Sequence, residues 1–291
     1  MRFAVLSYRA SRNFGDEIQS IAAARLLPRV DLAIPREGLR AFHSDEPVVL
    51  VMNGWMHSGM QFPPGECITP FYIGFHISKK SQRFFTTPEA VSHFRKHSPI
   101  GCRDRGTVDI LQQAGVDAFY SKCLTLTLPK RESANVRGGV AFVDIFHEKR
   151  INKRRIRRII GEKCLAVQTV GHSHHCDIAG YAAKTALAES LLSEYAAAEL
   201  VVTSRLHCAL PCVAMGVPVL YFGAREYRTE ILADIGITMH PPLMSSAKSL
   251  WQRWQEKRRF RGFDWTGETP DIETEKAAII SAFNAKLSPF L

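Results

Sequence analysis

The stretch Val201-Val-Thr-Ser-Arg-Leu-His-Cys-Ala-Leu-Pro-Cys-Val-Ala-Met-Gly-Val-Pro218 predicts an apolar strand that turns directly into a helix. Ser204, Arg205 and His207 follow the carboxyl end of this strand, the edge at which ligands of open parallel sheets gather. The residues after them are almost wholly apolar, so an arginine and a histidine are costly here unless a ligand or partner satisfies them. We therefore expect a functional role for His207, with a satisfied structural histidine as the alternative.

Outward from this stretch, short apolar runs alternate with helical patterns, which is typical of βα units around parallel sheets. The expected strands are Arg2–Ser7, Val48–Met52, Phe71–Ile77, Ile100–Arg103, Gly139–Ile145, Lys163–Val170, Leu200–Thr203 and Pro218–Tyr221. The expected helices are Glu17–Leu27, Pro88–Lys96, Thr107–Gln113, Ile151–Ile160, Tyr181–Ala197 and His207–Met215. The chain is predicted to be an α/β protein.

The length of 291 residues suggests two domains, since a domain typically has about 100 to 200 residues. A polar segment rich in Pro, Gly and charge, Pro129–Gly139, has the composition of a linker. We expect an N-terminal domain at 1–131, a C-terminal domain at 132–245 and a helical tail at 246–291. The tail contains two helical stretches, Lys248–Arg259 and Glu273–Leu287, and is expected to pack back across the domain junction.

Composition excludes several classes of protein. Hydrophobic residues make up 46% and charged residues 23%, which is ordinary for a globular chain and unlike disordered or collagen-like sequences. The longest apolar stretches are too short, or too interrupted, to cross a bilayer. We interpret the N-terminal segment as a first strand and not as a signal peptide. The seven cysteines lack Cys-x-x-Cys spacing and indicate reduced thiols, so we expect a cytoplasmic location.

The net charge of +10 favours an anionic partner, whether a phosphorylated metabolite, a lipid surface or a nucleic acid. A dense basic run covers residues 149–163, and a second one covers residues 253–261. Such runs are usually solvated helix faces, but the interleaved isoleucines of the first also suit a helix lying on an anionic membrane. We expect peripheral contact with the inner face of the cytoplasmic membrane. No nucleic-acid partner is expected, because no recognised binding motif is present.

Two motifs of the first half follow predicted strands. In Asn13-Phe-Gly-Asp16, Asp16 can cap the following helix, and the helix N-terminus can instead bind an anion or sugar hydroxyls. In Asn53-Gly-Trp55, the aromatic ring can stack on a sugar, although a plain turn is equally compatible.

A third motif, Gly101-Cys-Arg-Asp-Arg-Gly-Thr107, brings two guanidinium groups to another strand end. The planar fork of arginine suits bidentate binding of phosphate or carboxylate. The structural alternative is that Arg103 pairs with Asp104 or with another acid.

The segment Gly171-His-Ser-His-His-Cys-Asp177 invites a zinc interpretation, because it contains the possible ligands His172, His174, His175 and Cys176. Their spacing matches no site that we can justify, because adjacent residues rarely converge on one ion. We therefore predict no metal here. A substrate-facing loop, with His172 contacting substrate, or a solvated loop remains open.

Taken together, Asn13-Phe-Gly-Asp16, Arg103-Asp-Arg-Gly-Thr107 and Thr203-Ser-Arg-Leu-His-Cys-Ala-Leu-Pro-Cys212 resemble the polysaccharide pyruvyl transferase family. The resemblance spans about residues 10 to 230. The stretch Ser121–Leu128 also looks like a branch of that family, although many members have Asp-Pro where this chain has Cys123-Leu124.

The resemblance implies a GT-B-like fold: two Rossmann-like domains with parallel sheets facing across a cleft, and C-terminal helices that cross back. The N-terminal domain would then be the acceptor side and the C-terminal domain the donor side. It also implies a ketal pyruvyltransferase that moves a pyruvyl group from phosphoenolpyruvate to a sugar of a polysaccharide or its precursor, such as exopolysaccharide, capsule or cell-wall glycan. The acceptor could be lipid-linked, and no cofactor or metal is implied.

The resemblance maps catalytic positions onto His207 and Arg103. It maps substrate contacts onto Arg205 and Asp16, and onto Arg225 or Arg228 for a basic residue common in relatives. We add as expected substrate contacts the neighbouring polar and aromatic residues Ser204, Asn13, Asn53, Trp55 and His172. The alternative function is a GT-B glycosyltransferase using a nucleotide sugar, because fold alone does not fix function.

Overall fold

The computed structural model describes residues 1–145, 167–173, 180–242, 255, 258–259 and 263–291. The chain groups into two compact units. Unit 1 comprises Met1–Leu128, His174–Glu189 and Glu273–Leu291, and unit 2 comprises Pro129–Ser173 and Ser190–Ile272. Both units are therefore discontinuous in sequence, whereas the sequence analysis expected three contiguous segments.

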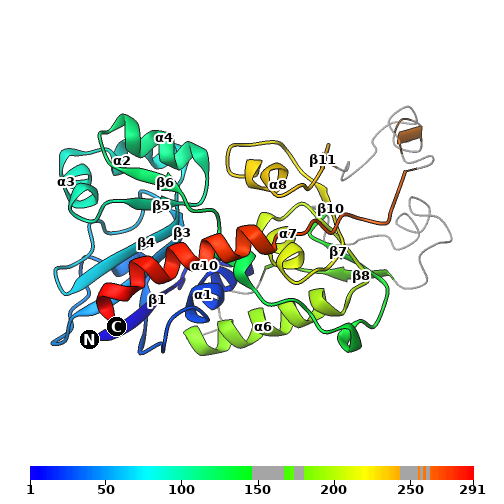
Figure 1. Ribbon diagram of the computed structural model, residues 1–291, viewed down its shortest axis with the longest axis horizontal. Helices are drawn as coiled ribbons and strands as arrows, with labels where there is room; N and C mark the ends of the chain where they lie inside the picture. Colours follow the sequence, from blue (N-terminus) through cyan, green and yellow to red (C-terminus); the bar gives the residue numbers. More distant parts are fainter. Residues whose placement is uncertain (146–166, 174–179, 243–254, 256–257, 260–262) are drawn as a thin grey trace. The chain divides into compact units, whose positions relative to one another are not determined.

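Unit 1 is built on a six-stranded parallel sheet with the order β2-β1-β3-β4-β5-β6 (Figure 1). Its strands are β1 (Arg2–Ser7), β2 (Leu32–Pro35), β3 (Val48–Met56), β4 (Ile68–Ile77), β5 (Ile100–Cys102) and β6 (Ala118–Tyr120). The chain moves from β1 to β2 on one side and then returns to add β3 on the other. A topological switch point therefore lies between β1 and β3, at the strand edge where such sheets bind ligands.

The two faces of this sheet are covered by different helices. They are α1 (Phe14–Ala24), α2 (Gln82–Phe85), α3 (Pro88–Lys96), α4 (Arg105–Gln113), the first half of α6 (Tyr181–Ala197) and α10 (Glu273–Leu287). Because side chains alternate across a strand, Tyr72 packs with Phe94 of α3, whereas the adjacent Phe71 packs with Phe283 of α10. The final helix thus belongs to the core of the N-terminal unit, as Figure 1 also shows.

Unit 2 contains a five-stranded parallel sheet with the order β11-β10-β9-β7-β8. The strands are β7 (Val140–Val143), β8 (Val167–Val170), β9 (Leu200–Thr203), β10 (Val219–Phe222) and β11 (Met239–His240), and the helices after them include α7 (Leu206–Ala214) and α8 (Glu230–Asp234). The core cluster of Phe142, Leu200, Val202 and Phe222 is covered by Phe263 and Trp265. Here the switch point lies between β7 and β9.

Short 3₁₀ turns complete the two units: η1 (Arg36–Gly38), η2 (Lys79–Ser81), η3 (Leu124–Thr127), η4 (Ser133–Asn135) and η5 (Ser288–Phe290). The prediction of an α/β fold with two parallel sheets is confirmed. The bounds of β1, β9, α3, α6 and α10 match those expected. The sequence analysis missed β2, β6, β11, α2 and α8, which have two to five residues each and are too short to show a hydrophobic period.

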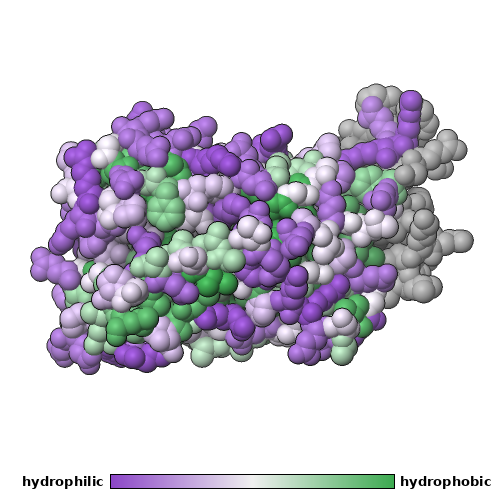
Figure 2. Space-filling model, viewed as in Figure 1, coloured by the Kyte–Doolittle hydropathy of each residue, from purple (hydrophilic) through white to green (hydrophobic). Residues whose placement is uncertain are grey.

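The predicted helix Ile151–Ile160 and the basic run at 149–163 lie outside the described residues, as does most of Lys248–Arg259. Among the helices that the structure describes, none has the length and apolar character needed to cross a bilayer. On the face drawn in Figure 2, hydrophilic side chains are interspersed with smaller groups of apolar ones.

Candidate functional site

The turn between β1 and α1 holds the first candidate group. Asn13 is the N-cap of α1, and its Oδ1 accepts a hydrogen bond from Gly15 N at 3.1 Å. Asp16 is buried and accepts a hydrogen bond from Ser11 Oγ. Burial raises the pKa of Asp16, while the charges of Arg36 and Arg103 act in the opposite direction. Asn13, and not Asp16, therefore caps α1. Asp16 lies at the switch point, close to the guanidinium groups of Arg36 and Arg103.

Arg103, Gln19 and Asn53 meet at the same edge from three different elements. Arg103 follows β5 and is 2% exposed, and its Nη1 donates to Gln19 Oε1 at 2.8 Å. Asn53 of β3 donates from Nδ2 to Gln19 O at 2.7 Å. The other polar atom of that amide, Oδ1, is buried and has no hydrogen-bond partner among the residues that the structure describes. The predicted residues Arg103, Asp16 and Asn53 therefore share one network, which is centred on α1.

Asp104 takes a separate, structural role. Its Oδ2 lies 2.5 Å from His76 Nδ1, and its Oδ1 accepts from Thr107 N at 2.9 Å, so it caps α4. Burial acts to raise the pKa of Asp104, but the hydrogen bond and charge of His76 outweigh it and the pKa is lowered. The side chains of Arg103 and Asp104 thus hydrogen-bond to different partners, Gln19 and His76.

Trp55 of β3 is a partly exposed aromatic side chain of unit 1. It is 39% exposed, and its ring lies 4.8 Å from that of His57. The guanidinium of Arg36 lies 5.5 Å from the Trp55 ring, and Arg36 Nη1 donates to Trp55 O at 2.9 Å. The exposed part of an indole held in this way can contact a sugar ring.

In unit 2, the turn between β9 and α7 holds Ser204 and Arg205 against Asp144. Arg205 Nε donates to Asp144 Oδ2 at 3.0 Å, and Ser204 Oγ donates to Asp144 O at 3.0 Å. Asp144 directly follows β7 and has a positive φ of 45°. The Arg205 side chain keeps 43% of its surface exposed. The ion pair therefore orients a guanidinium that remains accessible at the switch point between β7 and β9.

His207 is the second residue of α7 and is partly exposed. Its backbone is non-helical, with φ −84° and ψ 18°, a region in which many active-site residues lie. Arg205 and His207 are thus delivered to the strand's carboxyl end, as the motif predicts.

His172 is buried rather than solvent-facing, with 1% of its surface exposed. Its Nδ1 lies 2.7 Å from the hydroxyl of Tyr195, and its Nε2 has no hydrogen-bond partner within the described part of the chain. Burial, and secondarily the charge of Arg205, lowers the pKa of His172 to about 3. The imidazole is therefore neutral near pH 7, so His172 is unsuited to donate a proton as an imidazolium.

The remaining predicted residues follow β10 or belong to the His-rich loop. Arg225 and Arg228 are exposed after β10, and Arg228 Nε donates to Glu226 Oε2 at 2.8 Å. Residues 174–177 of the His-rich loop lie outside the described residues. Within the ranges that the structure describes, no group of three or more His, Cys, Asp or Glu could hold a metal ion.

Sequence reasoning missed Gln19, Arg36 and Asp144, which position the predicted residues. A signal existed for two of them: Gln19 lies one helical turn after Asp16, and Asp144 lies near the end of a predicted strand. Arg36 had no such signal, because it follows the unpredicted strand β2.

Comparison with protein families gives a match to the family described as polysaccharide pyruvyl transferase over residues 13–225. No curated protein matches. Among solved structures, an uncharacterized protein from Klebsiella pneumoniae subsp. pneumoniae NTUH-K2044 is similar, with 14% identity, a TM-score of 0.48 and coverage of 82% of this chain and 92% of that one.

Two further solved structures are similar over most of the chain. The UDP-GlcNAc 2-epimerase of Methanocaldococcus jannaschii has 9% identity and a TM-score of 0.41, with coverage of 98% of this chain and 100% of that one. The wall teichoic acid polymerase TagF has 9% identity and a TM-score of 0.42, with coverage of 99% and 90%.

Proposed function

The chain belongs to the polysaccharide pyruvyl transferase family, and on that premise we propose that it transfers the pyruvyl group of phosphoenolpyruvate to two hydroxyls of one saccharide unit. The products are a cyclic ketal and inorganic phosphate. The observation that carries the proposal is the turn between β9 and α7, where Asp144 orients a partly exposed Arg205 two residues before His207.

This turn suits an anionic donor. Phosphoenolpyruvate carries a phosphate and a carboxylate, and a guanidinium can bind either of them through two parallel N–H donors. Ser204 fixes this turn by donating its Oγ proton to Asp144 O, and the N-terminus of α7 follows at the same strand end. Positive charge held in place near the departing phosphate stabilises the transition state, so the proposal needs no metal and no cofactor.

The proposed reaction balances as follows. His207 as the imidazolium donates a proton to the methylene carbon of phosphoenolpyruvate, and the first sugar hydroxyl adds to C2 and returns a proton to His207. The C2–O bond to phosphate then breaks, and the second hydroxyl adds to C2, its proton leaving with the phosphate. The methylene becomes a methyl group, and C2 gains two bonds to sugar oxygens. A histidine suits this exchange because its charge changes near neutral pH.

Unit 1 is proposed to bind the acceptor. Asp16 and Asn53 offer oxygens at the switch point, and Trp55 offers a stacking surface. Arg103 is buried against Gln19, and its positive charge favours the ionised form of Asp16. We also propose that the acceptor is lipid-linked and is met at an anionic membrane surface. The net charge of +10 supports this, because basic residues are attracted to anionic lipids.

The test is turnover by the full chain. The protein is incubated with phosphoenolpyruvate and a panel of free, nucleotide-activated and lipid-linked saccharides, and phosphate release and the mass of one added pyruvyl ketal are measured together. Arg205→Ala should lose both signals, whereas Arg29→Ala, which removes an exposed arginine elsewhere, should keep them. Thermal stabilisation by UDP and not by phosphoenolpyruvate would contradict the proposal and favour a nucleotide-sugar enzyme.

A further inference from the structure

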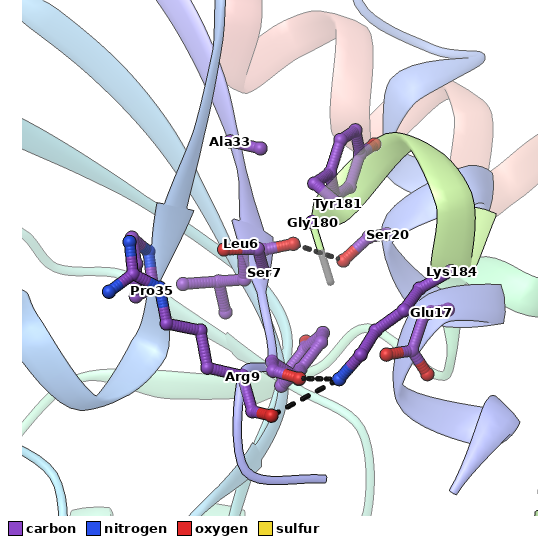
Figure 3. Close-up of a pocket in the computed structure, with 11 residues that line it drawn as sticks. Leu6, Ser7, Arg9, Glu17, Ser20, Ala33, Pro35, Gly180, Tyr181 and Lys184 are labelled. Carbon is purple, nitrogen blue, oxygen red and sulfur yellow. Dashed lines mark hydrogen bonds between the residues drawn. The ribbon is translucent and has the colours of Figure 1, made fainter. Parts of the chain in front are cut away.

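A cavity of about 430 Å³ lies in unit 1 beside the carboxyl end of β1 (Figure 3). Its described lining comes from the end of β1, from β2, from α1 and from the start of α6. The volume falls within the roughly 300 to 1,000 Å³ typical of pockets that hold small molecules. The family motifs do not include these lining residues, so the chemistry of the walls decides which ligand fits.

Part of this lining is accessible to a ligand and part is not. The lining residues from Leu6 to Tyr8, those of α1, and Lys184 are buried. The described lining residues that keep exposed surface are Arg9, Ala33, Pro35, Gly180 and Tyr181. Among these, Arg9 carries the charge, and the other side chains are apolar or aromatic. A ligand therefore meets a guanidinium next to a small apolar wall.

The Arg9 side chain is available for binding. Within the described part of the chain, its guanidinium has no hydrogen-bond or ion-pair partner. Figure 3 shows the side chain extending from the end of β1 toward Pro35. A guanidinium presents five N–H donors in a planar fork, which matches the oxygens of a phosphate or a carboxylate. Arg9 can therefore bind an oxyanion without breaking an ion pair within the described residues.

Lys184 fixes the backbone from which Arg9 extends. Its Nζ donates to three backbone carbonyl oxygens, those of Tyr8 at 2.7 Å, Arg9 at 3.2 Å and Ser11 at 3.3 Å. An ammonium group has three N–H donors, and the three carbonyls use all of them. Lys184 thus holds the segment after β1 in place and leaves the direct contact with a ligand to Arg9.

The charges of the described lining also favour an anion. Arg9 and Lys184 are cations, and Glu17 is the acidic group among the described lining residues. Burial raises the pKa of Glu17 to about 7, so near neutral pH its carboxyl carries only part of a negative charge. The balance of charge around the cavity is therefore positive.

The accessible wall beside Arg9 suits a ring. Ala33 and Pro35 of β2 contribute apolar surface, and Tyr181 of α6 contributes an aromatic side chain. A pyranose has apolar C–H faces that can pack on such side chains. A sugar ring that bears an oxyanion therefore complements both kinds of wall, the guanidinium and the apolar surface.

We propose that this cavity binds an anionic pyranose of the saccharide substrate, with its phosphate or carboxylate on Arg9 and its ring against Ala33, Pro35 and Tyr181. The inference rests on the proposed function for the view that the ligand is a saccharide. It adds that the substrate carries a negative charge on a sugar. The phosphate of an activated or lipid-linked sugar and the carboxylate of a uronic acid share this chemistry, and separate probes distinguish them.

The test measures binding without turnover, by calorimetry and saturation-transfer NMR on the full chain. The probes are the anomeric phosphates, the uronates and the neutral methyl glycosides of glucose, galactose and mannose, together with inorganic phosphate. Each titration is repeated with Arg205→Ala, because the proposed donor site in unit 2 could also bind an anion. We expect at least one charged sugar to bind both proteins, and the neutral glycosides to bind at least tenfold more weakly.

Variants of the lining separate the charge from the ring. Arg9→Gln should weaken binding of the charged sugar about 10- to 100-fold, since it removes charge-assisted hydrogen bonds, and Arg9→Lys should fall between it and the wild type. Tyr181→Ala should weaken binding of the charged sugar but not of inorganic phosphate. Arg83→Gln is the matched control, because it removes the same charge from an exposed position of α2 that does not line the cavity.

Several results would overturn the inference. They are absence of charged-sugar binding to Arg205→Ala, equal binding by Arg9→Gln, an equal loss in Arg83→Gln, and neutral glycosides or inorganic phosphate binding as tightly as the charged sugar. Tighter binding of the phosphates or of the uronates identifies the anion.

The fate of the proposed function is separate. Binding of a charged sugar that depends on Arg9, without phosphate release from phosphoenolpyruvate, would refute the pyruvyl transfer and leave the assignment of the cavity in place. Phosphate release by Arg9→Gln with an unchanged KM for a charged saccharide would refute the role of the cavity and leave the pyruvyl transfer in place.

Discussion

At the scale of single residues, Glu17 has a consequence for stability. Burial is the main cause that raises its pKa from 4.5 to about 7. Between these pH values the folded state holds a proton that the unfolded state has released, so stability falls as the pH rises from 4.5 to 7 and stays low above it. The loss should amount to about 3 kcal/mol, since one pKa unit corresponds to about 1.4 kcal/mol.

Glu17→Gln removes this titration and keeps the side-chain shape. The variant should therefore match the wild type in its urea midpoint near pH 5 and exceed it at pH 8. Urea unfolding curves at both pH values check the expectation. Parallel midpoints of the two proteins across the pH range would contradict it.

The sign is opposite for His172. Burial lowers its pKa to about 3, so below pH 6.5 the unfolded state binds a proton that the folded state does not. Its contribution to stability is complete above pH 6.5 and is lost as the pH falls toward 3. His172→Gln should flatten the decline of the urea midpoint between pH 6.5 and 4, whereas the exposed His43→Gln should leave the decline unchanged. A decline as steep as that of the wild type would show that His172 does not carry it.

His207 is the residue on which the proposed chemistry depends. His207→Gln should lower kcat by about 10² to 10⁴-fold, the usual contribution of a general acid. Phosphoenolpyruvate binding, measured as thermal stabilisation, should persist because Arg205 is intact. An unchanged kcat would move the proton donor elsewhere, to water or to His174, since His172 is neutral at pH 7.

At the scale of elements, α3 and α4 begin with caps of unequal importance. Thr87 caps α3 through one hydrogen bond to Ala90 N, whereas Asp104 caps α4 and also pairs with the buried His76. Thr87→Ala should cost about 1 kcal/mol, which is typical of a lost N-cap. Asp104→Ala should cost about 3 to 5 kcal/mol, because it leaves His76 buried without its partner. Urea unfolding of both variants compares the two losses, and equal losses would refute the role of the pair.

At the scale of the whole molecule, the chain returns at Glu273 to complete unit 1 with α10. Phe283 of this helix is 0% exposed and packs on Phe71, with ring centroids 4.8 Å apart. Phe283→Ala should destabilise unit 1 by about 3 to 5 kcal/mol. Amide hydrogen exchange should accelerate in β1, β3 and β4 and stay unchanged in β9 and β10, while Leu291→Ala, at an exposed position, should change neither. Acceleration confined to unit 2 would contradict this assignment of α10.

The sequence by itself determined the α/β class, the parallel strands and the delivery of Ser204, Arg205 and His207 to a strand end. These follow from local hydrophobic period and turn chemistry, which each segment carries within about ten residues. Only the tertiary structure decided which side chains meet across the chain. The pairs Arg103–Gln19, Arg205–Asp144 and Lys184–Tyr8 join residues 84, 61 and 176 positions apart. Such contacts depend on strand order and on where later segments return, and neither leaves a periodic trace in the sequence.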